Sequence, residues 1–140
     1  MTKLRNYDGA PGCSIEAALH IMGGKWKGVI LYHLLLDGTH RFNELQRRLT
    51  GVPPRLLIKQ LRDMEEDGLV VRKVYPVVPP KVEYSLSDEG RSLEPFILGL
   101  CGWGDAWLKR RGMTTAAQMR ADEEAAGLKS DAPFLAEEQG

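Results

Sequence analysis

The chain has 140 residues, and its 19 basic and 19 acidic side chains give a formal net charge of zero. That length suits one domain with its own core, and 43% hydrophobic and 27% charged residues are ordinary for a globular chain. No apolar run approaches the ~18 residues of a membrane helix, and no secretory signal is evident in the first residues. Two cysteines are too few for a disulfide framework. We therefore expect a cytoplasmic single-domain protein.

The charges are unevenly distributed along the chain. Residues 41–86 hold nine Lys or Arg against six Asp or Glu, whereas residues 113–140 hold two against six. An acidic tail thus cancels a basic middle, so net neutrality does not exclude a nucleic-acid partner. The asymmetry alone fits solvated charged faces equally well.

Turn-forming residues and helical periodicity organise the first third of the chain. Residues 1–12 are rich in turn formers and are expected to form a flexible arm. Ser14 is a suitable cap for a helix over residues 15–22, which a glycine pair ends. The apolar spacing then predicts a second helix over residues 25–36.

Two further helices follow, separated by a short turn. Asn43, with Gln46 three residues later, resembles a capping box and predicts a short helix over residues 44–50. Proline suits the first helical position, so Pro54 is expected to open a helix that ends at Gly68. Together these elements form a helix, a tight turn and a second helix.

The helix opened by Pro54 is amphipathic. Its apolar side chains and its cationic side chains follow the same helical spacing on opposite sides. The apolar positions are Leu57, Leu61 and Met64, and the cationic ones are Arg55, Lys59 and Arg62. We expect the cationic ends to point outward into solvent.

Beyond Gly68 the hydrophobic period changes from 3.6 to 2. Alternation over residues 82–86 predicts a half-buried strand, and the β-branched run over 69–75 is its expected partner. The proline-rich stretch between them cannot extend the ladder and should form a stiff, projecting loop. A last long helix, capped by Ser87 or Asp88, is expected to reach about residue 111. The tail beyond it is acidic and partly helical at most.

A mainly α fold with a small β-hairpin wing follows from this order, which is that of a winged helix-turn-helix. An exposed helix of this kind fits the major groove of DNA, where its side chains reach base edges. Lys and Arg of the wing can contact the sugar-phosphate backbone or an adjacent minor groove.

Six ordered segments over residues 13–107 resemble the HxlR family of bacterial winged-helix transcriptional regulators, within the MarR-like superfamily. They are CSIE at 13–16, IMGGKW at 21–26, RFNEL at 41–45, LRDMEEDGL at 61–69, YPVVPPKVEY at 75–84 and WG at 103–104.

The resemblance implies a homodimer that binds a pseudo-palindromic operator in double-stranded DNA. It places the winged domain and its dimerisation helices within residues 13–111, and it leaves an acidic tail over 112–140. Repressors are more usual than activators in the family. No catalysis on DNA and no cofactor are implied.

Candidate DNA contacts come from the basic helix and the wing. They are Arg41, Pro54, Arg55, Ile58, Lys59, Arg62, Arg72, Lys73 and Lys81. Strand alternation should turn either Arg72 or Lys73 toward the core side. Two positions depart from the family pattern: Pro53 replaces a capping Ser or Thr, and Ile58 stands where a polar residue is more usual and suits contact with a thymine methyl group. We therefore expect an altered operator preference.

Other residue types suggest regulation. Cys13 stands at the positive end of the first helix, where a thiolate is favoured, so it is a redox-sensing candidate; an inert thiol is the alternative. Trp26, Trp103 and Trp107 are candidates for lining a pocket for a flat effector, although packing is their more common use. The three histidines are scattered without metal-ligand spacing, so no metal site is expected.

Two other function classes compete with DNA binding. A winged helix can serve as a protein-interaction module without specific DNA binding, and the acidic tail would then be its docking arm. An enzyme is disfavoured, because the sequence has no nucleophile elbow, no phosphate-cradling glycine loop and no catalytic residue. A steep loss of DNA affinity with rising salt would distinguish a DNA-binding regulator from a protein-interaction module.

Overall fold

The computed structural model describes residues 12–127; residues 1–11 of the expected arm and 128–140 of the expected tail lie outside the described part. Its helices are α1 (Cys13–Met22), α2 (Lys27–Asp37), α3 (Phe42–Arg48), α4 (Pro54–Glu66), α5 (Asp88–Arg91), α6 (Glu94–Arg110) and α7 (Ala116–Ala125). Its strands are β1 (His40–Arg41), β2 (Val70–Tyr75) and β3 (Lys81–Leu86).

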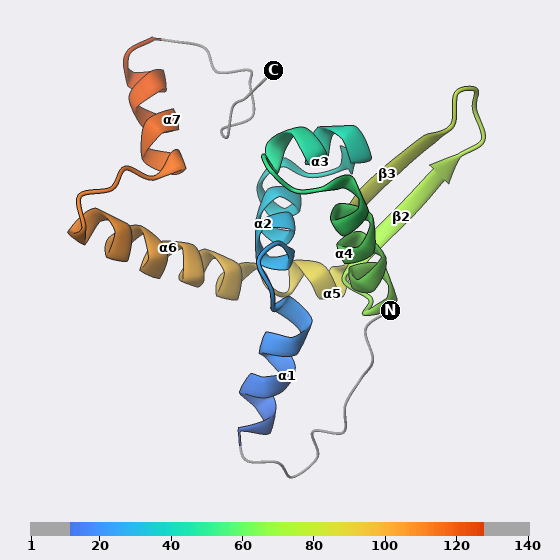
Figure 1. Cartoon of the computed structure of the whole chain (residues 1–140), viewed down its shortest axis with the longest axis horizontal. Helices are drawn as coiled ribbons and strands as arrows, with labels where there is room; N and C mark the ends of the chain where they lie inside the picture. Colours follow the sequence, from blue (N-terminus) through green and yellow to red (C-terminus); the bar gives the residue numbers. More distant parts are fainter. Residues whose placement is uncertain (1–11, 128–140) are drawn as a thin grey trace.

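The helices and strands form a winged helix-turn-helix, as the sequence predicts. Helices α2, α3 and α4 form the body, and the β2–β3 hairpin projects from it as the wing, while α1 and α6 extend away from the body (Figure 1). The sheet is antiparallel with the strand order β1-β3-β2. The mainly helical fold class with a small β wing is confirmed.

The core lies where α2, α3 and α4 meet the base of the sheet. Its fully buried side chains come from every element of the helix-turn-helix; they are Ile30 and Leu31 of α2, Leu45 and Leu49 of the α3 region, and Leu57, Leu61 and Met64 of α4. Ile97 connects α6 to the same cluster. Burial of these stripes fixes which face of α4 remains outside.

Helix α4 begins at Pro54, as predicted, and ends at Glu66, two residues before the predicted Gly68. Pro54 occupies its first turn, where a missing N–H costs nothing, and extended Pro53 precedes it without a side-chain cap. Gly68 then adopts a positive φ of 84°, and Leu69 N–H donates to the carbonyl of Met64 at 2.9 Å. This left-handed glycine closes the helix and directs the chain into β2.

Two predicted helix caps are wrong. Helix α1 begins at Cys13 after Gly12 in a left-handed conformation, so Ser14 lies inside the helix and not at its cap. Helix α3 begins at Phe42, and the Arg41 N–H donates to Glu44 Oε1 at 2.7 Å, in place of the expected Asn43 cap. In both cases the helix begins one residue before the polar side chain that was predicted to cap it.

The predicted last helix is divided in two. Ser87 caps α5 by accepting a hydrogen bond from Gly90 N–H, but the chain turns at residues 92–93 and α6 starts afresh. The cause is Pro95, which has no N–H to donate to the carbonyl of Arg91 and therefore fits only the first turn of a new helix.

Strand β1 and helix α7 complete the described chain. The two residues of β1 pair with β3, His40 opposite Tyr84, and the sequence analysis did not predict this strand. Part of the acidic tail forms α7, whose first turn is capped by Thr115 Oγ1 accepting from Gln118 N–H at 3.1 Å.

Candidate nucleic-acid interface

The outer face of α4 is the most conspicuous basic surface of the helix-turn-helix. Arg55, Ile58, Lys59 and Arg62 are all exposed, and Ile58 keeps 42% of its surface accessible. They lie opposite the buried stripe of the same helix, because burial of that stripe leaves only this side to solvent. Helix α4 therefore presents two arginines, one lysine and one branched apolar side chain outward.

Lys59 does not project freely from this face. Its Nζ lies 3.0 Å from Oδ2 of Asp63, one turn further along the helix, whose side chain is only 5% exposed. Burial favours the neutral acid, but the hydrogen bond and charge of Lys59 help to hold the pKa of Asp63 below its usual value. Part of the positive charge of Lys59 is thus balanced within the helix, whereas Arg55 and Arg62 have no ion-pair partner among residues 12–127.

The wing turns its two neighbouring cations to opposite faces. Arg72 pairs with Tyr84 and Lys73 pairs with Glu83 across β2 and β3, and directly opposed residues share a face. Since Tyr84 is buried, Arg72 lies on the face turned toward the body, yet it stays exposed because the hairpin projects beyond the core. The expected alternation is therefore observed, without burial of either side chain.

The other face of the wing carries a cluster of charges centred on Glu83. Tyr75 donates a 2.8 Å hydrogen bond to Glu83 Oε1, and Lys81 Nζ lies 3.4 Å from Oε2; together they lower the pKa of Glu83. Lys73 and Lys81 also lie over the Tyr75 ring, with Nζ at 4.9 and 4.7 Å from its centroid. Arg41 of β1 faces Glu83 from the other side.

Five of the predicted contacts are therefore divided between two faces of the sheet. Arg62 of α4 and Arg72 of β2 line the same open hollow between helix and wing, whereas Arg41, Lys73 and Lys81 surround Glu83 on the opposite face of the sheet. The outward exposure of the α4 cations is as predicted. The division of the other cations between two faces depends on strand register, which the sequence pattern does not give.

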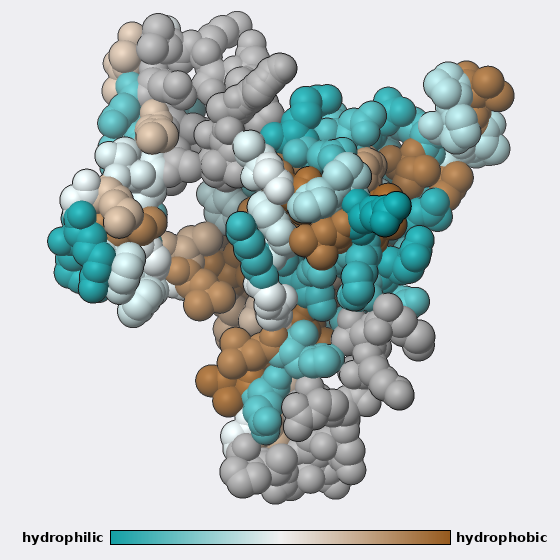
Figure 2. Space-filling model, in the orientation of Figure 1, coloured by the Kyte–Doolittle hydropathy of each residue, from teal (hydrophilic) through white to brown (hydrophobic). Residues whose placement is uncertain are grey.

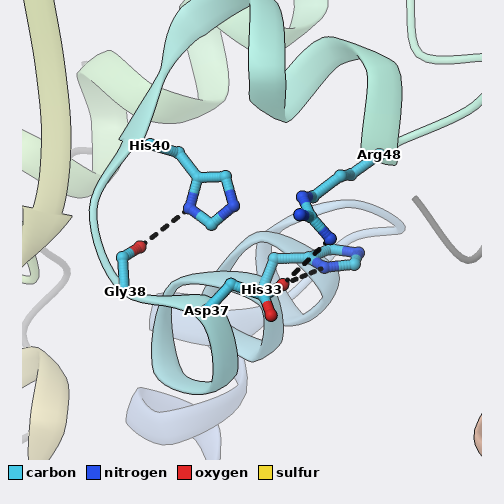
Figure 3. Close-up of polar contacts among 5 residues, drawn as sticks. All are labelled: His33, Asp37, Gly38, His40 and Arg48. Carbon is cyan, nitrogen blue, oxygen red and sulfur yellow. Dashed lines mark hydrogen bonds and ion pairs between the residues drawn. The ribbon is translucent and has the colours of Figure 1, made fainter. Parts of the chain in front are cut away.

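A polar contact between α2 and α3, built beside the buried His33, was not predicted. His33 is fully buried and its Nδ1 lies 3.6 Å from Oδ2 of Asp37, which also pairs with Arg48 of α3 at 3.2 Å (Figure 3). His40 Nδ1 and the Gly38 carbonyl oxygen lie 2.8 Å apart nearby. Arg48 is thus engaged in holding α3 against α2. The i, i+4 spacing of His33 and Asp37 was the available sequence signal.

The regulatory candidates lie on α1, α2 and α6. Cys13 is the first residue of α1 and is half-buried. Cys101 on α6 is also half-buried, and this burial raises the pKa of its thiol. Trp103 is 66% exposed. The guanidinium carbon of Arg111 lies over the ring of Trp107, 3.7 Å from the ring centroid. Trp26 immediately precedes α2 and packs against the edge of the core. None of the three tryptophans lines the hollow beside α4.

Comparison with known proteins identifies the family. The model of the HxlR-like helix-turn-helix family matches residues 21–112, which include α2 through α6 and the whole wing. The chain belongs to the HxlR-like helix-turn-helix family. A curated relative, described as the uncharacterized HTH-type transcriptional regulator YdeP of Bacillus subtilis (strain 168), is 47% identical over 116 residues, covering 83% of this chain and 90% of YdeP.

Solved structures support the same assignment. The redox regulator HypR in its reduced form is 49% identical, with a TM-score of 0.64 over 66% of this chain and 91% of that chain. A transcriptional regulator of the MarR family from Enterococcus faecalis V583 is 38% identical, with a TM-score of 0.63 over 77% of this chain and 98% of that chain. The resemblance to HxlR and MarR-like regulators is therefore confirmed.

Family membership settles the broad class of function. This HxlR-family chain is a transcriptional regulator with a DNA-binding helix-turn-helix, and its relatives are regulators, not enzymes. Within residues 12–127, no helix combines the length and the apolar character required to span a membrane. Over the same residues, no three His, Cys, Asp or Glu side chains are grouped so that they would hold a metal ion.

Proposed function

We propose that this HxlR-family protein is a homodimeric, sequence-specific DNA-binding repressor that acts in the cytoplasm and responds to an oxidant or small molecule. The observation that carries the proposal is the exposed cationic face of α4, directly opposite its buried stripe. In the proposed complex, Arg55 and Arg62 reach base edges in the major groove, and Ile58 contacts a thymine methyl group. Pro54 brings the first turn of α4 close to the phosphates.

The wing supplies the backbone contacts in this proposal. Arg72, Lys73 and Lys81 are exposed or half-buried cations on a hairpin that projects beside α4, and Arg41 is the second residue of the adjacent strand β1 (Figure 1). Phosphate contacts fix the register of a protein on DNA but carry no sequence information. We therefore assign specificity to α4 and affinity to the wing.

Two copies are proposed to associate through α1 and α6. Both helices expose large apolar side chains that a lone protomer leaves in water: Ile15 and Leu19 on α1, and Phe96, Leu100 and Trp103 on α6. Figure 2 shows brown surface on both helices. A two-fold dimer would present two α4 helices to half-sites about 34 Å apart, which matches a pseudo-palindromic operator.

Cys13 is the proposed oxidant sensor. It is the first residue of α1, the helix that exposes Ile15 and Leu19, so modification of its thiol would disturb the proposed dimer contact. HypR, which is 49% identical, is described as a redox regulator with reduced and oxidized forms. A shift of α1 would change the spacing of the two α4 helices and weaken operator binding.

Genome-wide footprinting of the purified protein, with and without a thiol oxidant, tests the proposal. We expect protected sites with two half-sites one turn apart, and loss of protection on oxidation in the native chain but not in Cys13→Ser. On the site so found, Arg55→Ala and Arg62→Ala should each weaken binding about 5- to 150-fold, since one good base contact contributes about 1–3 kcal/mol. Arg91→Ala on α5 is the matched control and should bind normally.

Salt dependence distinguishes this proposal from the protein-interaction alternative. Six to ten phosphate contacts reduce affinity by about 10³- to 10⁵-fold between 50 and 200 mM salt. DNA binding that is weak and nearly independent of salt, with unchanged affinity in both arginine variants, would exclude α4 as the DNA-reading helix.

A further inference from the structure

The wing tip, residues 76–80, has no role in the proposed function as stated above. It joins β2 to β3 beyond their last pair, Tyr75 opposite Lys81. The exposed fraction of the residue rises from 3% at Val70, at the base of the hairpin, to 99% at Val78. At about 3.4 Å per residue, the six residues of each strand carry the tip roughly 20 Å outward (Figure 1). The tip can therefore enter a partner that the body of the protein does not reach.

The wing tip is apolar and carries no charge. All five of its residues are exposed; they are Pro76, Val77, Val78, Pro79 and Pro80. Figure 2 shows brown surface at the outer end of the wing. The nearest cations of the wing, Lys73 and Lys81, stand behind the tip, where both ammonium groups lie over the ring of Tyr75. The wing thus places an apolar end ahead of a cationic stem, formed by these two lysines.

The wing tip also has almost no hydrogen-bond donor. Proline has no N–H, and the N–H of Val77 donates to the carbonyl of Tyr75 at 2.8 Å. Among residues 76–80, at most the N–H of Val78 remains. Base edges in the minor groove present mainly acceptors, and phosphate oxygens accept only, so both require donors. The tip is therefore unsuited to either, and it gains free energy from DNA through apolar contact.

The largest apolar surface that duplex DNA can offer is the face of a base. That face becomes accessible when a base step opens, and apolar side chains, proline included, open such steps from the minor groove in DNA-bending proteins. Opening a step costs free energy, which further contacts must offset. Lys73 and Lys81 lie close enough behind the tip to bind the phosphates on either side of the groove.

We propose that the wing tip is a wedge that enters the minor groove beside the half-site, opens one base step with Val78 and Pro79, and bends the operator there. The inference rests on the proposed function, since it assumes that α4 reads the adjacent major groove. It makes Val78 a specificity-determining residue that makes no hydrogen bond to a base. Pyrimidine–purine steps open most easily, so the operator should carry such a step at the position of the tip.

Fluorescence energy transfer between the two ends of the footprinted operator duplex measures the bend. We expect the native full chain to bend the duplex by about 20–90°, the range for apolar wedges. Val78→Ser should bend it less and bind about tenfold more weakly, as the loss of one buried valine side chain predicts. Val71→Ser is the matched control, because Val71 is an exposed valine of the same hairpin outside the tip, and it should bind and bend as the native chain does.

Val78→Lys separates a wedge from an electrostatic contact. The added charge should strengthen binding to phosphates, but a strongly hydrated ammonium group does not open a base step. We therefore expect Val78→Lys to lose the bend while its affinity becomes more dependent on salt. A Val78→Lys chain that bends the operator as the native chain does would overturn the wedge.

A mismatch scan locates the opened step. A T·T mismatch is moved one step at a time outward from each half-site of the operator. Because unstacking is least costly at a mismatched base, the native chain should bind about two- to tenfold more tightly when the mismatch reaches the tip, and Val78→Ser should show no such position. Equal profiles for the two chains would overturn the wedge.

The remaining outcomes distinguish the wedge from the proposed function. A native chain that binds its operator without bending it would overturn the wedge and leave the proposed function standing. If the tip instead contacts a second copy of the chain, Val78→Ser would keep the bend and reduce only the cooperative filling of two adjacent operators, which also overturns the wedge. Failure to bind any DNA would contradict the proposed function itself, and the wedge with it.

Discussion

Glu83 is the acidic residue about which Arg41, Lys73 and Lys81 gather on one face of the sheet. Its carboxylate accepts a hydrogen bond from Tyr75 and lies 3.4 Å from Lys81 Nζ, with Lys73 and Arg41 directly opposite on the flanking strands. It therefore holds the side chains of this face in place and also subtracts from their positive potential. These two roles have opposite effects on DNA affinity.

Glu83→Gln separates the two roles. The amide can still accept the hydrogen bond from Tyr75 but carries no charge, so we expect non-specific DNA affinity at low salt to rise about two- to fivefold, the range for one exposed charge pair. Fluorescence anisotropy with a random duplex measures it, and Glu89→Gln on α5 is the matched control. Unchanged affinity would mean that this face of the wing does not approach DNA.

Gly90 is the residue at which α5 and the start of β2 approach most closely. A Cβ at Gly90 would lie 2.2 Å from the carbonyl oxygen of Leu69, which is backbone and cannot turn aside. We therefore expect Gly90→Ala to lower the free energy of unfolding by about 1–3 kcal/mol, as overpacking does. Urea denaturation measures it. Gly28→Ala in α2, where nothing lies within 4 Å, should be neutral or stabilising, and equal losses in both would refute the close approach.

At the scale of elements, the burial of a histidine within α2 makes stability depend on pH. Burial of His33 lowers its pKa from 6.5 to about 4, because the charged form would lose its hydration, although Asp37 partly opposes the shift. The unfolded chain therefore binds a proton more readily than the folded chain at pH values between about 4 and 6.5. Stability is full above this window and falls as the pH is lowered through it.

The predicted loss is about 3 kcal/mol between pH 7 and pH 4, since each unit of pKa difference corresponds to 1.36 kcal/mol. Urea denaturation at half-unit pH steps measures the slope. His33→Gln cannot titrate at this position and should show a smaller slope in this window. A slope in His33→Gln as steep as in the native chain would assign the pH dependence to another group.

The same elements show which parts of the fold the sequence could predict. Helix α4 and the wing follow from local signals, namely Pro54, Gly68 and the change of period, so their bounds were close. Strand β1 is two residues long and forms only by pairing with β3, about forty residues further along the chain. No local sequence pattern therefore predicts it. Pro95 was a local signal for the break before α6. The apolar periodicity that continues through this region favoured one long helix instead.

The candidate site was predictable to a similar extent. Exposure of Arg55, Lys59 and Arg62 follows from periodicity within a single helix. The register of β2 and β3, which pairs Arg72 with Tyr84, decides which cations share a face of the wing. Strand register is set by tertiary structure and cannot be found from periodicity within one strand. The hollow between α4 and β3 likewise needs two elements at a defined separation, so the sequence alone gave no indication of it.

At the scale of the whole molecule, the apolar surfaces of α1 and α6 are the feature that a single protomer does not explain. Phe96, Leu100 and Trp103 follow each other at i, i+4 and i+7 on α6, and each is more than 60% exposed. A monomer gains nothing from this stripe, whereas a two-fold partner would bury it on both copies at once. Dimerisation and operator binding should therefore be lost together.

Leu100→Glu places a charge in the middle of the stripe and should convert the proposed dimer to a monomer of about 15.6 kDa by light scattering. Operator affinity should then fall by at least about 100-fold, because the second half-site is no longer bound at high effective concentration. Leu36→Glu, the same change at an exposed leucine of α2, is the matched control and should remain dimeric. A Leu100→Glu chain that keeps both the dimer mass and the operator affinity would show that the two copies associate through another surface.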